Sequence, residues 1–109
     1  ENVSLCCLDI NNGEIIWCKD IDGNYYGGSP IIADDKVIVS TTFVYSEELV
    51  SGKLLCFDAE TGEEIWNYYS EGLCNGWSTP AFAYDNIYIA LTNHAFEIIG
   101  DGEIHCIDQ

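Results

Sequence analysis

The 109 residues predict an all-β protein made of repeated, four-stranded antiparallel units. A pattern that begins with Asp and ends with Trp occurs twice, as DINNGEIIW over residues 9–17 and as DAETGEEIW over residues 58–66. Short runs of β-branched residues, bounded by Gly, Asn, Asp or Pro, are typical of strands. No window keeps an apolar i, i+3, i+4, i+7 pattern over the ~11 residues that a helix would need.

The repeat extends beyond this pattern, at an offset of 49 to 50 residues. Ser29-Pro30 returns as Thr79-Pro80, and residues 102–108 repeat residues 52–58. Counted in units, the chain holds the back half of one copy, a complete second copy and about three quarters of a third. Stacked repeats need neighbours to cover their apolar faces. We therefore expect an excerpt of a longer protein, whose partners are the remaining units or other copies of the chain.

The strands follow one another in the same order in each unit. Hairpins are expected at residues 34–35 and 84–86, and longer connections at residues 43–52 and 93–101. The strands outside the Asp-to-Trp hairpins are expected at residues 5–9, 31–33, 37–42, 53–58, 81–84, 87–92 and 103–108.

The two Asp-headed turns have the chemistry of tight hairpins. Asp9 and Asp58 carry carboxylates that can accept backbone N–H bonds across the turn. Gly13 and Gly62 stand where such a hairpin needs a positive φ. Each turn should therefore join two antiparallel strands, the second of which ends near a tryptophan.

The Asp–Gly–Trp pattern, followed by a Ser/Thr-Pro-headed strand, an Asp and another strand, resembles the tryptophan-docking repeat of pyrroloquinoline-quinone-type β-propellers. The resemblance covers nearly all of residues 1–109 and implies about two and a quarter blades of a partial propeller. The blades would be residues 5–17 (the end of one), residues 29–68 (a complete one) and residues 78–108 (most of a third).

In that family the tryptophan that closes the last strand packs between neighbouring blades. The resemblance implies this role for Trp17 and Trp66, since a large indole can fill the space between two sheets and donate its N–H to an adjacent turn. The structural docking set would then be Asp9, Gly13, Trp17, Asp58, Gly62 and Trp66.

A kelch propeller is the alternative with a similar period and a Trp after an Asp-headed turn. Kelch blades end their second strand with a Gly-Gly pair. Ser40-Thr41 and Ala90-Leu91 occupy those places here, which disfavours the kelch interpretation.

The charge excludes some classes of partner. With 3 Lys and Arg against 19 Asp and Glu, the net charge is −16, which opposes binding to nucleic acid or to an anionic membrane surface. No apolar stretch approaches the ~18 residues of a membrane span. The family occurs mostly in cell envelopes and periplasms, so the resemblance implies an extracytoplasmic location.

Three of the six cysteines, Cys7, Cys56 and Cys106, occupy one equivalent strand position. Sheets that face each other lie about 10 Å apart, whereas a disulfide needs Cα atoms within about 7 Å. We expect them to be small buried side chains that do not bridge one another. Cys6 should point to the opposite side of its strand from Cys7.

The remaining thiols and imidazoles give no zinc signature. Cys18 and Cys74, expected at a strand end and in a connection, lack C-x-x-C spacing, and His94 and His105 are isolated in the sequence. Each histidine is expected to be a surface or locally bonded imidazole.

Two further ligand sites are considered. Asp20, Asp22 and Asn24 place oxygen atoms at alternate positions, which would suit Ca²⁺, although a solvated polar connection has the same composition. The quinone enzymes of the family need an aromatic floor under the cofactor, and Trp77, expected at the inner end of a blade, is a candidate for it, although a packing role is the favoured alternative.

The functional prediction is a non-catalytic, PQQ-like propeller segment that acts as a binding or assembly scaffold, possessing no catalytic residue and no cofactor. Two alternatives stay open. The chain could be a fragment of a PQQ- and Ca-dependent alcohol or sugar dehydrogenase, or a surface propeller that binds carbohydrate or peptide through the pairs Tyr25-Tyr26 and Tyr68-Tyr69.

Overall fold

The computed structural model describes residues 3–21, 25–26, 29–44, 50–73, 79–92 and 102–108. In this part of the chain every regular element is a strand, which confirms the all-β prediction. The strands are β1 (Val3–Leu8), β2 (Ile15–Ile21), β3 (Tyr25–Tyr26), β4 (Ile31–Ala33), β5 (Lys36–Val44), β6 (Val50–Asp58), β7 (Glu64–Glu71), β8 (Ala81–Ala83), β9 (Asn86–Thr92) and β10 (Gly102–Asp108).

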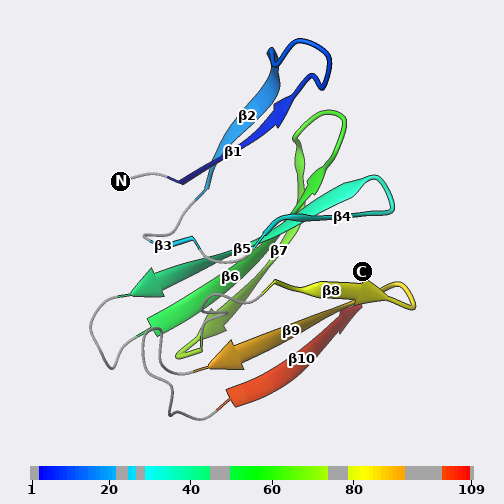
Figure 1. The fold of residues 1–109 in the computed structure, drawn as a ribbon. Coiled ribbons are helices and arrows are strands. Elements are labelled where there is room, and N and C mark those ends of the chain that lie inside the picture. Colours follow the sequence, from blue (N-terminus) through cyan, green and yellow to red (C-terminus); the bar gives the residue numbers. More distant parts are fainter. Residues whose placement is uncertain are drawn as a thin grey trace.

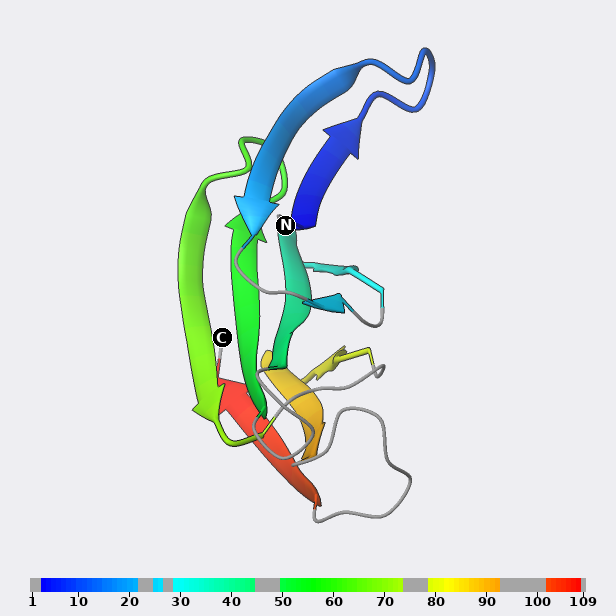
Figure 2. The same ribbon diagram turned by 90° about the vertical axis from the view of Figure 1, so that its left-hand side faces the viewer.

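The strands form three antiparallel sheets that follow one another along the chain (Figure 1). The first is the hairpin β1–β2, the central sheet has the order β3-β5-β6-β7 with β4 also on β5, and the third has the order β10-β9-β8. Turned by 90°, the molecule shows β1–β2 toward the top, the central sheet in the middle and β9–β10 toward the bottom (Figure 2). The central sheet is therefore the one with a neighbour on each side.

The strands of the central sheet are longer than expected. β5 and β6 continue in register to the pair Val44↔Val50, so part of the expected connection 43–52 is strand. Gly52, the last residue of that expected connection, is buried inside β6 opposite Thr42. The β-branched run before Val44 favours the extended strand over a loop.

One edge of the central sheet is made by two short strands, β3 and β4, where a single strand was expected. β3 pairs through Tyr25↔Thr42, and β4 pairs with the same strand through Ile31↔Ile38. β3 lies before residue 29, where the complete unit was expected to begin. The outer strands also continue past their tryptophans, to Ile21 in β2 and to Glu71 in β7.

The turns carry the backbone conformations that the sequence predicted. Gly13 and Gly62 have φ of 75° and 77°, in the left-handed region. The short hairpins have positive φ at both central residues, Asp34 with Asp35 and Tyr84 with Asp85, as in the primed turns that match strand twist.

The two faces of the central sheet bury different side chains. Val39, Leu55 and Phe57 pack with Ile21 and Leu5 of the first sheet. On the other side, the buried cluster joins central and third sheets and contains Ala33, Ile38, Leu54, Cys56, Ile87, Ile89 and Leu91. Because both faces are covered, β5 and β6 are buried along most of their length, polar residues such as Ser40 and Ser51 included.

Among the described residues, nothing comparable covers the outer faces of the flanking sheets. Leu8, the equivalent of the buried Phe57, is exposed, and so is Ile104, the equivalent of Leu54. A helix that is both long enough and apolar enough to cross a membrane does not occur among the described residues.

Candidate functional site

The candidate site is the Asp58–Gly62 turn together with the indole of Trp17. The Asp58 carboxylate accepts hydrogen bonds from the N–H groups of Glu60 (2.9 Å) and Thr61 (3.0 Å). The Gly62 N–H donates to the Asp58 carbonyl at 2.9 Å, which closes the turn. The turn is thus held by its own first residue, as the sequence predicted.

The first hairpin carries a second copy of this turn. The Asn11 N–H donates to the Asp9 carboxylate at 2.8 Å, and the Gly13 N–H donates to the Asp9 carbonyl at 2.8 Å. The two turns therefore have matching hydrogen bonds and matching glycine conformations.

Hydrogen bonds from the backbone N–H groups of Thr61 and Glu60 hold the pKa of Asp58 below its ordinary value of 3.8. A depressed folded-state pKa means that the contribution of Asp58 to stability is present above the unfolded value and is lost as pH falls through the folded value. In the wild-type protein, the urea concentration at the unfolding midpoint should fall as the pH drops below about 4. We expect this fall to be smaller in the Asp58→Asn variant. Urea unfolding across this range checks it; parallel falls in the two proteins would contradict the expectation.

Trp17, which belongs to β2 of the first sheet, packs on the Asp58–Gly62 turn of the central sheet. Its indole Nε1 donates to the Ala59 carbonyl at 3.0 Å. A Cβ added to Gly62 would lie 2.6 Å from Cδ2 of the indole, closer than real Cβ contacts come. Glycine is therefore required here twice, for its positive φ and for the space that the ring occupies.

A β-bulge sets the position of each tryptophan. The register of β1–β2 shifts between Cys7 and Leu8, so that Cys7 pairs with Trp17 and Leu8 with Ile15, leaving Ile16 as the extra residue. The same shift in β6–β7 brings Trp66 opposite Cys56. A bulge re-aims the side chains that follow it. Each indole is thereby directed to the side of the next sheet along the chain.

Trp66 has a similar place but a different set of partners. Its half-buried ring packs against the cluster between the central and third sheets. Its Nε1 is buried and has no hydrogen-bond partner among the described residues. In the repeat, the residue equivalent to Ala59 is Gln109, which lies outside the described residues.

An apolar pocket of ≈ 320 Å³ opens beside Trp17, between the first and central sheets. Its wall includes Leu5, Cys7 and Trp17 from the first sheet and Pro30, Ile32 and Val37 from the central sheet. Ile38, the neighbour of Val37 in β5, faces the other way and fills the corresponding interface with the third sheet.

The second interface carries a chain of polar contacts. The hydroxyl of Tyr68 in β7 lies 2.6 Å from Nδ1 of His105 in β10. Nε2 of the same imidazole lies 2.8 Å from Glu103 Oε1. His105 is thus locally bonded, as one of the expectations for it stated, and it links the two sheets.

Replacing Tyr68 with phenylalanine should cost about 0.5–1.5 kcal/mol of stability, because it removes the hydrogen bond to His105 without opening a cavity. Urea unfolding measures the loss. Tyr69→Phe is the control, since the Tyr69 hydroxyl bonds to Ser51 within its own sheet. Only Tyr68→Phe should speed amide exchange in β10; equal effects of the two variants would show that the inter-sheet contact adds nothing.

Of the other predicted site residues, only Asp20 lies within the described part of the chain. Asp20 lies in β2 and accepts a hydrogen bond from Ser4 Oγ at 3.0 Å, while Asp22, Asn24 and Trp77 lie outside the described residues. Within the described ranges, no group of three His, Cys, Asp or Glu side chains could hold a metal ion. The expected calcium and quinone positions therefore stay predictions.

The expected pair of exposed tyrosines at 68 and 69 is corrected. Adjacent strand residues point to opposite faces, so Tyr68 packs against the buried cluster while Tyr69 stays exposed. They cannot form one stacking platform. The side chains of Tyr25 and Tyr26 lie outside the described part.

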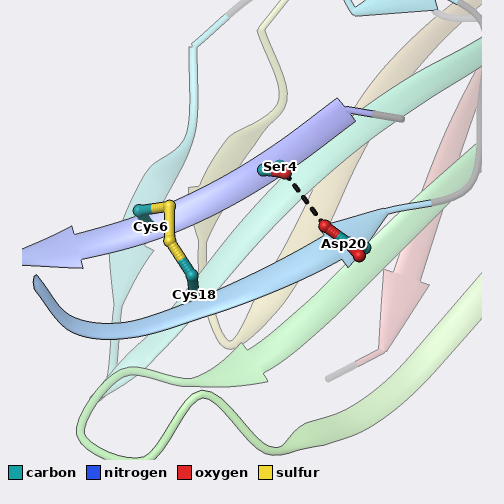
Figure 3. The surroundings of a disulfide bond; sticks show 4 residues. All are labelled: Ser4, Cys6, Cys18 and Asp20. Atoms are coloured by element: carbon teal, nitrogen blue, oxygen red, sulfur yellow. Dashed lines mark hydrogen bonds between the residues drawn. A yellow bond between two sulfur atoms is a disulfide. The ribbon is translucent and has the colours of Figure 1, made fainter. Parts of the chain in front are cut away.

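A disulfide joins Cys6 of β1 to Cys18 of β2, with Cα atoms 4.1 Å apart (Figure 3). Sequence reasoning missed it and placed Cys18 at a strand end, whereas Cys18 lies inside β2. The available signal was the hairpin, but the pairing depends on the bulge, which makes Cys6 and Cys18 direct partners.

The three equivalent cysteines are free, in agreement with the expectation that they do not bridge one another. Their expected burial holds for Cys56, but Cys7 is half-buried and Cys106 is exposed. The reason is that only the central sheet is covered on both faces.

Comparison with known proteins identifies related sequences. The model of the family described as outer membrane protein assembly factor BamB matches residues 1–109. The lanthanide-dependent methanol dehydrogenase of Methylacidiphilum fumariolicum (strain SolV) is 33% identical over 72 residues, covering 62% of this chain and 12% of the dehydrogenase. Outer membrane protein assembly factor BamB of Shewanella oneidensis (strain ATCC 700550 / JCM 31522 / CIP 106686 / LMG 19005 / NCIMB 14063 / MR-1) is 32% identical over 68 residues, covering 62% of this chain and 15% of that protein. These matches confirm the predicted resemblance to PQQ-type repeats, and the chain spans well under two thirds of either relative.

Proposed function

Because the chain belongs to the family whose model is described as outer membrane protein assembly factor BamB, we propose that it is a non-catalytic β-propeller segment that acts as a binding or assembly scaffold. The observation that carries this proposal is the contact of Trp17 with Ala59 and Gly62, by which one sheet is docked on the next. The assembly factor named among its relatives supports the same function.

The partners in this proposal are adjoining blades, from the same protein or from another copy of the chain. The Gly13 turn repeats the backbone conformation of Gly62, yet no atom of another described residue lies within 4 Å of a Cβ built there. Ile10, the equivalent of Ala59, is 97% exposed and Leu8 beside it is exposed as well. This surface offers an adjoining indole the same glycine and carbonyl that receive Trp17.

Site-specific photo-crosslinking in the intact protein tests this surface. A photoreactive residue at Ile10 should crosslink to a tryptophan-bearing strand of an adjoining blade. Tyr84, which is also highly exposed but lies on a hairpin without a tryptophan, is the control position. Failure of Ile10 to crosslink above the level at Tyr84 would overturn the proposal.

The similarity to a methanol dehydrogenase favours one alternative, a segment of a quinone-dependent dehydrogenase. Adding pyrroloquinoline quinone with Ca²⁺ or a lanthanide to the intact protein distinguishes the scaffold from the dehydrogenase. The scaffold proposal expects neither stoichiometric cofactor absorbance nor dye-linked alcohol oxidation. Either result would establish the enzyme in its place.

We place the protein outside the cytoplasm, in the cell envelope. The bridge between Cys6 and Cys18 supports this, since disulfides persist in oxidising compartments. Fractionation of the source cells would check it, and recovery in the cytoplasm with both cysteines reduced would contradict it.

A further inference from the structure

The Cys6–Cys18 bridge lies next to the docking residue Trp17. The pair Cys6↔Cys18 is adjacent in register to the pair Cys7↔Trp17. Figure 3 shows the two sulfur atoms spanning β1 and β2, with the Ser4–Asp20 hydrogen bond farther along the same strands. Any opening between these strands near the bridge would therefore displace Trp17 directly.

Within its own sheet, the hairpin that holds Trp17 has no third strand among the described residues. β1 pairs with β2 alone among the described strands, whereas its equivalent β6 pairs with β5 and with β7. A two-stranded sheet is at best marginally stable on its own. The matching positions in the central sheet are Leu55 and Asn67, so the second hairpin has no bridge and relies on its neighbours.

Both cysteines of the bridge are exposed in this structure. Cys18 is exposed, on the outer strand of its sheet. Asn67, its equivalent, stays exposed although both faces of the central sheet are covered. An adjoining blade packed on the first sheet would therefore leave the Cys18 sulfur open to attack by a thiolate.

Two of the described free thiols, Cys7 and Cys56, are poorly placed to exchange with the bridge. Cys7 points to the opposite side of β1, into the pocket beside Trp17. Cys56 is buried in the cluster on the far side of the central sheet, and burial raises the pKa of its thiol above the ordinary value of 9.0. The bridge should thus open by an external reductant instead of by internal shuffling.

We propose that the Cys6–Cys18 disulfide is a redox-sensitive clamp that holds Trp17 on the Asp58–Gly62 turn. An external dithiol supplies two electrons and two protons: the S–S bond breaks, Cys6 and Cys18 become thiols, and the dithiol closes to its own disulfide. The hairpin then loosens and Trp17 leaves Ala59 and Gly62. This inference rests on the proposed docking function, because it regulates the same contact.

Peptide-resolved amide hydrogen exchange of the intact protein, with and without dithiothreitol, tests the clamp. Reduction should speed exchange in β1 and β2 by at least about tenfold and expose the Asp58–Gly62 turn, with β6 and β7 unchanged beyond that turn. The Cys6→Ser/Cys18→Ser variant should exchange fast with or without reductant. Cys106→Ser, which removes an exposed free thiol, is the control and should behave as wild type.

The outcomes separate the clamp from the docking function. Trp17→Ala keeps the bridge but removes the indole, and should expose the Asp58–Gly62 turn in the oxidised protein. If Trp17→Ala exposes the turn and reduction of the wild-type protein does not, the clamp is wrong and the docking function stands. If Trp17→Ala leaves the turn protected, docking itself is wrong. Alkylation that finds Cys6 and Cys18 free before reduction would also overturn the clamp, without requiring any variant to fold.

Discussion

Replacing Gly62 with alanine should destabilise the protein by about 2–5 kcal/mol. One part is the cost of placing a Cβ at a φ of 77°, about 1–2 kcal/mol. The other is the overlap of that Cβ with the Trp17 ring, 2.6 Å away, for which overpacking values of about 1–3 kcal/mol are typical. Urea unfolding followed by circular dichroism measures the loss.

Gly13→Ala is the matched control for this variant. Gly13 has a φ of 75°, and a Cβ added there would have no described atom within 4 Å. Gly13→Ala should therefore cost only the conformational part, about 1–2 kcal/mol. In a Trp17→Ala background, the loss of stability caused by Gly62→Ala should decrease to the same value. Equal losses for the two glycines in the wild-type background would mean that the indole does not rest on Gly62.

Leu54→Ala is expected to cost about 2–5 kcal/mol, because it leaves a cavity in the cluster between the central and third sheets. Leu54 is 1% exposed. The surrounding residues of this cluster, which lie in β5, β6 and β9, prevent the cavity from collapsing. Equilibrium unfolding in urea measures this, and a loss below about 1 kcal/mol would show that the two sheets are not packed on each other.

Ile104 occupies the same place in the third unit and is 80% exposed. Ile104→Ala in this chain should change stability by less than about 0.5 kcal/mol. In the intact protein, the proposed adjoining blade would bury Ile104, so the loss should rise toward that of Leu54→Ala. A negligible loss in both settings would count against a blade on this face.

Turn chemistry could be predicted because it is local. An Asp whose carboxylate meets the N–H groups two and three residues later, and a Gly that supplies positive φ, act within five residues of each other. The hairpins centred on residues 34–35 and 84–85 were found for the same reason. The length of β5 and β6 could not be predicted in this way, because the pairing of Val44 with Val50 depends on a partner strand and not on local propensity.

The bulges show how a one-residue shift escapes sequence reasoning. If the strands paired regularly, with Ile16 opposite Cys7, the register set by Leu8↔Ile15 would place Cys6 opposite Trp17, and no bridge to Cys18 would form. The bulge at Ile16 shifts this register by one residue. With it, the bridge and the indole take adjacent positions. Nothing in the pattern of residues 9–17 announces the shift, because regular and bulged hairpins have the same composition.

The all-β class, the repeat, the Asp-headed turns and the positions of the two tryptophans can be read from the amino-acid sequence, since each follows from residues that are near one another or recur at one spacing. The burial of each repeated position is set by the packing of the sheets. Cys7, Cys56 and Cys106 share one place in the pattern, yet one is half-buried, one is buried and one is exposed. Burial depends on whether another sheet covers that face, and a residue's own unit does not contain that information.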